Sequence, residues 1–145
     1  MSGTGDRQRA TGNGQQELRR GQDIAERLMS LGVAAMRITT RLPKNPASRH
    51  LTLQLFRSAT GAGASYEEAR AAESRADFVH KVGVAAKEMR EACYWFGLVH
   101  RSGWLDADLT SIVREAGELA AILAASARTA RARAPTTEVA AQRQG

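Results

Sequence analysis

Apolar residues, with a few small serines among them, recur in this chain at alternating steps of four and three residues, in four separate stretches. That spacing keeps the apolar side chains on one face of an α-helix, where they form a continuous seam against a partner helix. The seams are Ile24, Leu28, Leu31, Ala35, Ile38 and Leu42; Leu51, Leu55, Ser58, Ala62, Ser65, Ala69 and Ala72; Phe78, Val82, Ala85, Met89, Ala92, Phe96 and Val99; and Leu109, Ile112, Ala116, Leu119, Leu123, Ser126 and Ala130. Four seams of similar length with short connections predict an all-α fold, an antiparallel up-and-down four-helix bundle.

The first two helices have clear expected limits. Residues 1–22 are rich in Gly, Gln, Thr and Arg and contain little to bury, so we expect a disordered arm there. The first helix is then expected to begin near Asp23 and to end at Pro43, because proline lacks the amide proton that a helix interior needs. After a short connection, the second helix is expected to start at Ala47 or Ser48.

Capping residues set the limits of the last two helices. Ser74, with Asp77 three residues later, has the form of an N-terminal capping box, and this predicts the start of the third helix. Gly103 marks its C-terminal end, and Asp106 or Asp108 is the expected cap of the fourth helix. The bundle domain is therefore expected to span residues 23–133, followed by a disordered polar tail at 134–145.

Two glycines fall inside the second seam. Gly61 and Gly63 each cost a helix about 1 kcal/mol relative to alanine, so a loop at residues 60–64 is an alternative to a continuous helix. We favour continuity, because the seam keeps its phase across both glycines and a loop would have no reason to preserve it. Small side chains here would also let a neighbouring helix come close.

Composition indicates one domain of a basic protein. The 145 residues are 43% hydrophobic, carry a formal charge of +6 and have a sequence pI near 10.4, so an anionic partner such as nucleic acid is a candidate. Cys93 is the only cysteine and is interpreted as a small buried side chain. We expect a cytoplasmic protein with no membrane association, because no apolar run approaches the length of a membrane span.

Catalytic and metal-binding patterns are weak. A di-metal bundle needs several inward carboxylates and Glu-x-x-His pairs, whereas this chain offers Asp77-x-x-His80 once. Gly61-x-Gly63 lacks the remainder of a phosphate-binding loop. His50 and His100 have no nucleophile at a convincing spacing. We therefore expect no enzymatic activity, no cofactor and no metal site.

Basic residues are more informative because no acid separates them. Between Arg27 and Tyr66 there is not one Asp or Glu. In an antiparallel bundle the first connection and the end of the third helix lie at the same end, which would gather most of the predicted nucleic-acid-binding residues. These are Arg37, Arg41, Lys44, Arg49, Arg57 and Arg101. A solubilising surface is the alternative, and Asp106 and Asp108 weaken the patch. No aromatic residues alternate with these cations, so we expect backbone-driven binding with little sequence preference.

Two further sets of residues could serve association. Met29, Val33, Met36, Leu53, Phe56, Trp95 and Trp104 are apolar but lie off the seams, and they would either widen the core or form a subunit interface. Glu67, Glu68, Arg70, Glu73, Arg75 and Asp77 form a charge cluster at the second helix junction. Ion pairs within the chain are the preferred interpretation, since Glu67 with Arg70 and Asp77 with Lys81 have the spacing of same-face helical pairs.

Three segments carry a family resemblance. Gln54–Ser58, Gly63–Ala69 and Ala72–Lys81 resemble, in order, the four-helix bundle proteins encoded by intervening sequences in bacterial 23S ribosomal RNA genes. The resemblance extends over about residues 23–130, with Ser65 where many members have asparagine. It implies a non-enzymatic bundle that forms a ring-like homo-oligomer, a pentamer. It also implies a role like that of relatives that bind nucleic acid as accessory proteins of reverse transcriptases in diversity-generating retroelements.

The function expected from the sequence is therefore binding of the RNA or DNA backbone by a self-associating bundle, as an accessory to a larger machine such as a reverse transcriptase or a ribosomal-RNA-associated element. The alternative is a structural homo-oligomer whose partner is a protein and whose basic charge is incidental.

Overall fold

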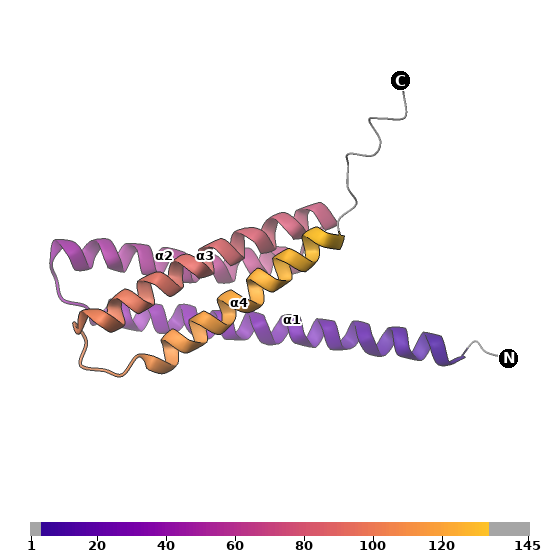
Figure 1. The fold of residues 1–145 in the computed structure, drawn as a ribbon, viewed down its shortest axis with the longest axis horizontal. Helices are drawn as coiled ribbons and strands as arrows, with labels where there is room; N and C mark the ends of the chain where they lie inside the picture. Colours follow the sequence, from indigo (N-terminus) through magenta and orange to yellow (C-terminus); the bar gives the residue numbers. More distant parts are fainter. Residues whose placement is uncertain (1–3, 134–145) are drawn as a thin grey trace, which may run out of the picture.

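The computed structural model describes residues 4–133, with side chains described from Gly12 onward. Every regular element in that range is a helix: α1 spans Thr4–Thr39, α2 Pro46–Arg70, α3 Arg75–Ser102 and α4 Thr110–Arg133. Consecutive helices pack side by side, and α4 also contacts α1 (Figure 1). The predicted all-α class with four helices is confirmed.

The helix ends follow from local chemistry. Asn45 precedes α2 and its Oδ1 accepts a hydrogen bond from the Ser48 amide at 2.8 Å, while Pro46 occupies a first-turn position where no amide proton is needed. Ser74 caps α3 by accepting from the Asp77 amide at 3.1 Å, as predicted. Gly103 ends α3 with φ of 66°, in the left-handed region that glycine enters without steric cost.

The four predicted seams meet in one core. Phe96, Leu55 and Leu119 are fully buried at its centre. Five predicted seam residues are half-buried: Ser65, Ala72, Phe78, Ile112 and Ser126. Ala25, Ala59, Tyr66 and Ala127 are buried although they lie off the seams. The helical period therefore predicted the buried face of each helix to within about one position.

The glycine-containing part of α2 is helical throughout, which confirms continuity across Gly61 and Gly63. A Cβ atom built on Gly63 would lie 3.8 Å from Leu28 Cβ on α1, an ordinary contact distance. A Cβ on Gly61 would instead overlap the carboxylate of Glu88 on α3. Small residues thus bring α2 close to both neighbours, with Ser58 buried beside them and donating to the Gln54 carbonyl at 2.7 Å.

The first helix differs from its predicted limits at both ends. It begins at Thr4 and not near Asp23, so the part of the expected arm that the structure describes is helical. Residues 15–20, Gln-Gln-Glu-Leu-Arg-Arg, are good helix formers, which allows the helix to continue although residues 12–20 are exposed. It ends at Thr39 and not at Pro43, because residues before a proline disfavour helical backbone and Thr39 and Thr40 bond back to the preceding turn.

In Figure 1, α1 runs past the other helices at the end where α2 gives way to α3. The predicted tail at 134–145 lies outside the described residues. Among the described helices, none is long and apolar enough to cross a membrane.

We predict that Gly63→Ala stabilises the fold by about 0.5–1 kcal/mol, because its Cβ has room beside Leu28 and alanine favours the helix by that amount. Urea denaturation should give a higher midpoint with an unchanged slope. Gly61→Ala is the matched control and should gain less, because Glu88 must move aside. A lower midpoint for Gly63→Ala would show that α1 and α2 approach more closely than 3.8 Å allows.

Candidate nucleic-acid interface

Five of the six predicted binding residues lie at one end of the bundle. Arg37 is in the last turn of α1, Arg41 and Lys44 are in the connection to α2, Arg49 follows the start of α2, and Arg101 is in the last turn of α3. Figure 1 shows the α1–α2 and α3–α4 connections at the same end. All five side chains are exposed, and none forms an ion pair with another described residue. We call these five residues the basic end.

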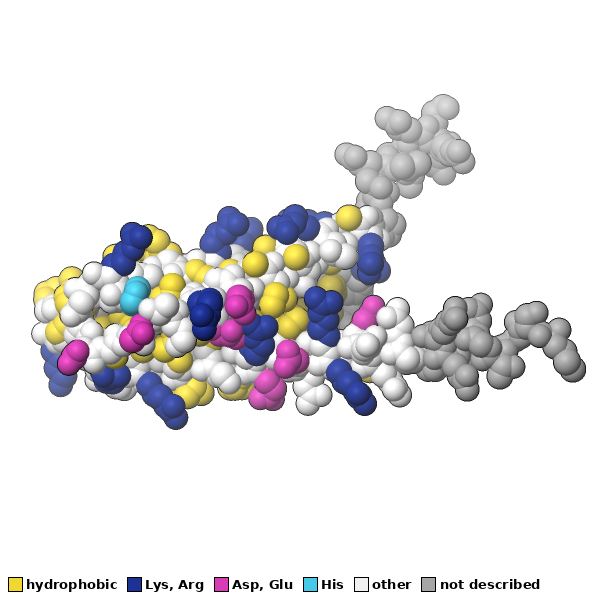
Figure 2. Space-filling view, turned by 60° about the horizontal axis from the view of Figure 1, so that its bottom comes forward, with side chains coloured by type: hydrophobic (Ala, Val, Ile, Leu, Met, Phe, Trp, Pro, Cys, Tyr) yellow, Lys and Arg dark blue, Asp and Glu magenta, His cyan; other side chains and the backbone are white. Residues whose placement is uncertain are grey.

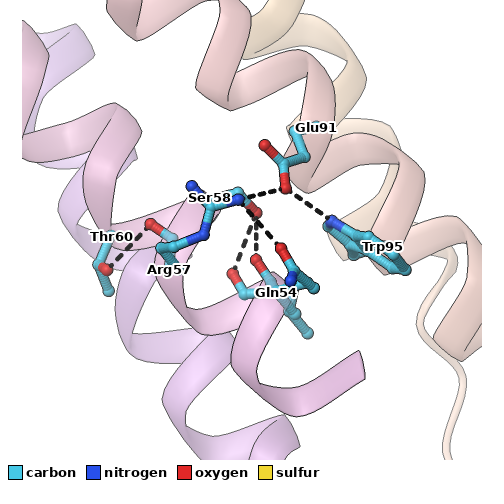
Figure 3. Close-up of polar contacts among 7 residues, drawn as sticks. Gln54, Arg57, Ser58, Thr60, Glu91 and Trp95 are labelled. Carbon is cyan, nitrogen blue, oxygen red and sulfur yellow. Dashed lines mark hydrogen bonds and ion pairs between the residues drawn. The ribbon is translucent and has the colours of Figure 1, made fainter. Parts of the chain in front are cut away.

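Arg57, the sixth predicted residue, is not part of the basic end. It lies 11 residues beyond Pro46 on α2, roughly 16 Å along the helix axis. Its guanidinium donates to Glu91 Oε1 at 2.7 Å and to Gln54 Oε1 at 3.0 Å (Figure 3). Spacing along the sequence placed Arg57 with the other cations, whereas the acid that neutralises it comes from α3.

Arg27, which opens the acid-free stretch, is also neutralised from another helix. Its Nε and Nη2 bond Glu115 on α4 at 2.7 and 2.9 Å, and Nη2 also reaches Glu118 at 2.9 Å. The hydrogen bond from Arg27 holds the pKa of Glu115 below its usual value. A bidentate ion pair of this kind holds α1 against α4.

Two acids lie near the basic end. Asp106 and Asp108 are exposed in the connection between α3 and α4. Asp108 Oδ1 accepts from the Thr110 amide at 2.9 Å, and hydrogen bonds with Thr110 lower the pKa of this carboxyl. Asp108 therefore stays ionised as a helix-start residue and partly offsets the charge of Arg101 and its neighbours. Figure 2 shows a mixed face in which cations, acids and apolar side chains alternate.

An aromatic group that sequence spacing did not reveal lies between α2 and α3. His50 and Trp95 pair edge to face with ring centres 5.8 Å apart, and Tyr94 and Trp95 do so at 4.9 Å. Trp95 Nε1 donates to Glu91 Oε1 at 3.2 Å, the same oxygen that binds Arg57 (Figure 3). The sequence does show Tyr94 and Trp95 as adjacent aromatic residues. His50 joins them only because of the way α2 packs along α3.

A second surface is apolar and lies along α1 and α2. Met29, Val33 and Met36 follow one exposed face of α1, and Leu53 and Phe56 follow an exposed face of α2. Gly32 and Thr60 mark where the two faces meet, since a Cβ on Gly32 would be 3.8 Å from Thr60 Cγ2. Met36 lies one turn after Gly32 and Phe56 one turn before Thr60, so both lie toward the basic end, at matching height. These residues form the apolar strip; Trp95 is excluded because it is half-buried against the core, and Trp104 lies beyond α3.

A third feature is a groove between α1 and α4, about 870 Å³ in volume, at the end of the bundle opposite the basic end. Ile24, Phe78 and Ile122 form apolar parts of its lining. Arg20, Arg75 and Arg133 also line it, against the single acid Glu17. Such a lining is complementary to an apolar segment that carries negative charge.

Residues of catalytic type show no convergent arrangement in the described part of the chain. Between residues 4 and 133 no group of three or more His, Cys, Asp and Glu side chains could hold a metal ion. Cys93 is half-buried, and burial raises the pKa of its thiol, which disfavours the reactive thiolate.

One of the two expected ion pairs at the α2–α3 junction is present: Arg70 bonds Glu67 at 3.0 Å. Lys81 bonds Glu68 across the junction and not Asp77, because the end of α2 packs beside the start of α3. This supports the interpretation of the charge cluster as pairing within the chain, at least for these four residues. Pairs this exposed contribute little to stability, because water screens the two charges.

A protein-family match covers most of the bundle. The family model described as 23S rRNA-intervening sequence protein matches residues 20–125. This chain belongs to that family. A crystal structure of a protein of unknown function from the S23 ribosomal protein family of Bacteroides thetaiotaomicron is similar, with 27% identity and a TM-score of 0.66 over 74% of this chain and 97% of that one. Comparison with curated proteins finds no match.

We predict that Glu88→Gln stabilises the fold at neutral pH. Burial raises the pKa of Glu88, with Arg57 opposing and Glu91 adding to the rise. A carboxyl whose pKa is raised on folding costs no stability below its unfolded pKa and costs most above its folded pKa. The variant should therefore have a higher urea midpoint at pH 7 and no advantage at about pH 3. Equal midpoints at both pH values would contradict the burial of this charge.

Proposed function

We propose that this member of the 23S rRNA-intervening sequence family is a non-enzymatic, antiparallel four-helix bundle that self-associates and binds the phosphate backbone of RNA or DNA. The observation that carries the proposal is the basic end: five exposed cations from three helices and the α1–α2 connection, none in an ion pair with a described residue. Clustered Lys and Arg free to replace counterions are what backbone binding requires.

Self-association strengthens this binding. The apolar strip leaves Met29 64%, Met36 50% and Leu53 62% exposed, which is unusual for side chains that occur together on one face. A second copy would cover the strip, and a ring-like oligomer, as in the pentamer implied by the family, would present several basic ends to one strand. Repetition of weak sites raises the overall affinity through effective concentration. We propose that this assembly acts in the cytoplasm as an accessory to a larger machine, such as a reverse transcriptase.

The alternative is a scaffold whose partner is a protein. The groove between α1 and α4 favours it, because an apolar lining with Arg20, Arg75 and Arg133 suits an acidic amphipathic helix of that partner. In that case the basic end contributes solubility. Absence of RNA binding, together with saturable binding of a synthetic Glu/Leu amphipathic peptide that Ile122→Glu abolishes, would select this alternative.

We predict that reversing Arg37, Arg41 and Arg49 to glutamate abolishes binding of a fluorescein-labelled single-stranded RNA at low salt while leaving helicity unchanged. For the wild type, the logarithm of affinity should fall linearly with the logarithm of salt, by roughly 0.7 per phosphate contact. Fluorescence anisotropy over a salt series measures both quantities, and circular dichroism measures helicity.

The matched control reverses Arg19, Arg128 and Arg133, which are exposed, carry the same total charge and lie away from the basic end. It should retain most of the affinity. Equal losses in the two triple variants would mean that net charge alone drives binding. No wild-type binding at low salt, or binding that salt does not weaken, would reject the proposed function.

We predict that Met36→Glu with Phe56→Glu shifts the protein from oligomer to monomer, because two buried charges at matching height would face a neighbouring copy. Multi-angle light scattering at several concentrations measures the mass. Leu18→Glu is the control, since Leu18 is 73% exposed on α1 outside the apolar strip. A wild-type protein that is monomeric at all concentrations would remove self-association from the proposal.

A further inference from the structure

The aromatic group on α2 and α3 has one solvent-exposed ring, that of Tyr94. Tyr94 is 62% exposed, whereas its neighbour Trp95 is half-buried and packs against the core. The two rings meet edge to face, at 77°, so they do not cover one another as stacked rings would. A planar ligand could therefore lie flat on Tyr94.

Trp95 is held in a fixed orientation, which makes the group a firm support for Tyr94. Its ring contacts His50. Its indole nitrogen donates to Glu91, which is itself held by Arg57 (Figure 3). The Arg57 guanidinium also compensates the charge of Glu91, the acid bonded to Trp95. Without that compensation, a carboxylate here would repel a phosphate backbone.

Cations continue on the same face of α3. Arg90 lies one turn before Tyr94 and Arg101 two turns after it, and both are exposed. Arg101 belongs to the basic end, and seven residues correspond to roughly 10 Å along the helix. The exposed Leu98 lies between them and extends the apolar surface next to the Tyr94 ring. A stacking surface with cations on both sides is the arrangement by which proteins bind single-stranded nucleic acid.

We infer that Tyr94, supported by Trp95 and His50, stacks on an unpaired base of a single strand whose phosphates continue to the basic end. The inference rests on the proposed nucleic-acid binding and specifies its substrate as unpaired and not duplex. In a duplex, the bases are stacked on one another and their faces are closed to Tyr94. The ligand chemistry is common to single-stranded RNA and DNA, and both strands serve as probes.

The test compares three labelled probes of equal length, each about 12 nucleotides per strand: an oligouridine, the same backbone with abasic residues, and a duplex. Wild-type protein should bind the oligouridine most tightly. Tyr94→Ala should weaken binding of the oligouridine roughly 5- to 100-fold and leave the abasic strand and the duplex unchanged. The slope against salt should stay the same, because no phosphate contact is lost. An oligothymidine should behave like the oligouridine.

Two variants separate stacking from a structural role. Tyr94→Phe keeps the ring and should retain the affinity of the wild type for the oligouridine. Leu18→Ala removes an exposed apolar side chain outside the apolar strip and should keep the wild-type preference for the intact over the abasic strand. Circular dichroism should show equal helicity for all variants.

Two results would overturn the inference while leaving the proposed function intact. One is salt-dependent binding of the oligouridine that Tyr94→Ala does not change. The other is equal affinity of the wild type for the intact and the abasic strand. Failure of the wild type to bind any of the three probes at low salt would instead reject the proposed function, and the stacking role with it.

Discussion

Close packing in the middle of α2 is the constraint on which the rest of the structure depends. Gly63 lies against Leu28 on α1, and Gly61 leaves space that the Glu88 carboxylate of α3 occupies. Because a larger side chain at Gly61 would displace that carboxylate, the small residues help to fix how α2 is placed along α3. The same register pairs Arg57 with Glu91 and Glu68 with Lys81, one on each side of the glycines. It also brings His50 to Trp95.

Charge pairing between helices determines which cations remain available. Arg27 is bound by two acids of α4, and Arg57 by one acid of α3, although both belong to a stretch without a single acid of its own. The cations of the basic end lie in the helix ends and in the α1–α2 connection, where none of them pairs with a described acid. The cations of the acid-free stretch thus form three ion pairs, through Arg27 and Arg57, and most of one exposed cluster.

The sequence predicted the bundle well, because burial is a periodic property that each helix expresses on its own. The Ser74 cap, the end at Gly103 and the unbroken α2 were all predictable from local chemistry. The start of α1 was not, since residues 12–20 bury nothing and carry no seam for the period to reveal. The neutralisation of Arg57 and the grouping of His50 with Trp95 were not predictable either, because both depend on the register between two helices.

The apolar strip and the exposed Tyr94 ring lie on different helices, and this bears on how they would work together. The apolar strip lies along the exposed faces of α1 and α2, whereas Tyr94 lies on the face of α3 that carries Arg90, Leu98 and Arg101. The strip and the α3 face share no residue, so a copy on the strip and a strand on the α3 face would use different side chains. Each added copy would bring another Tyr94 ring and another basic end. Assembly would therefore add contacts to one nucleic-acid strand, while different residues form the subunit interface and the strand interface.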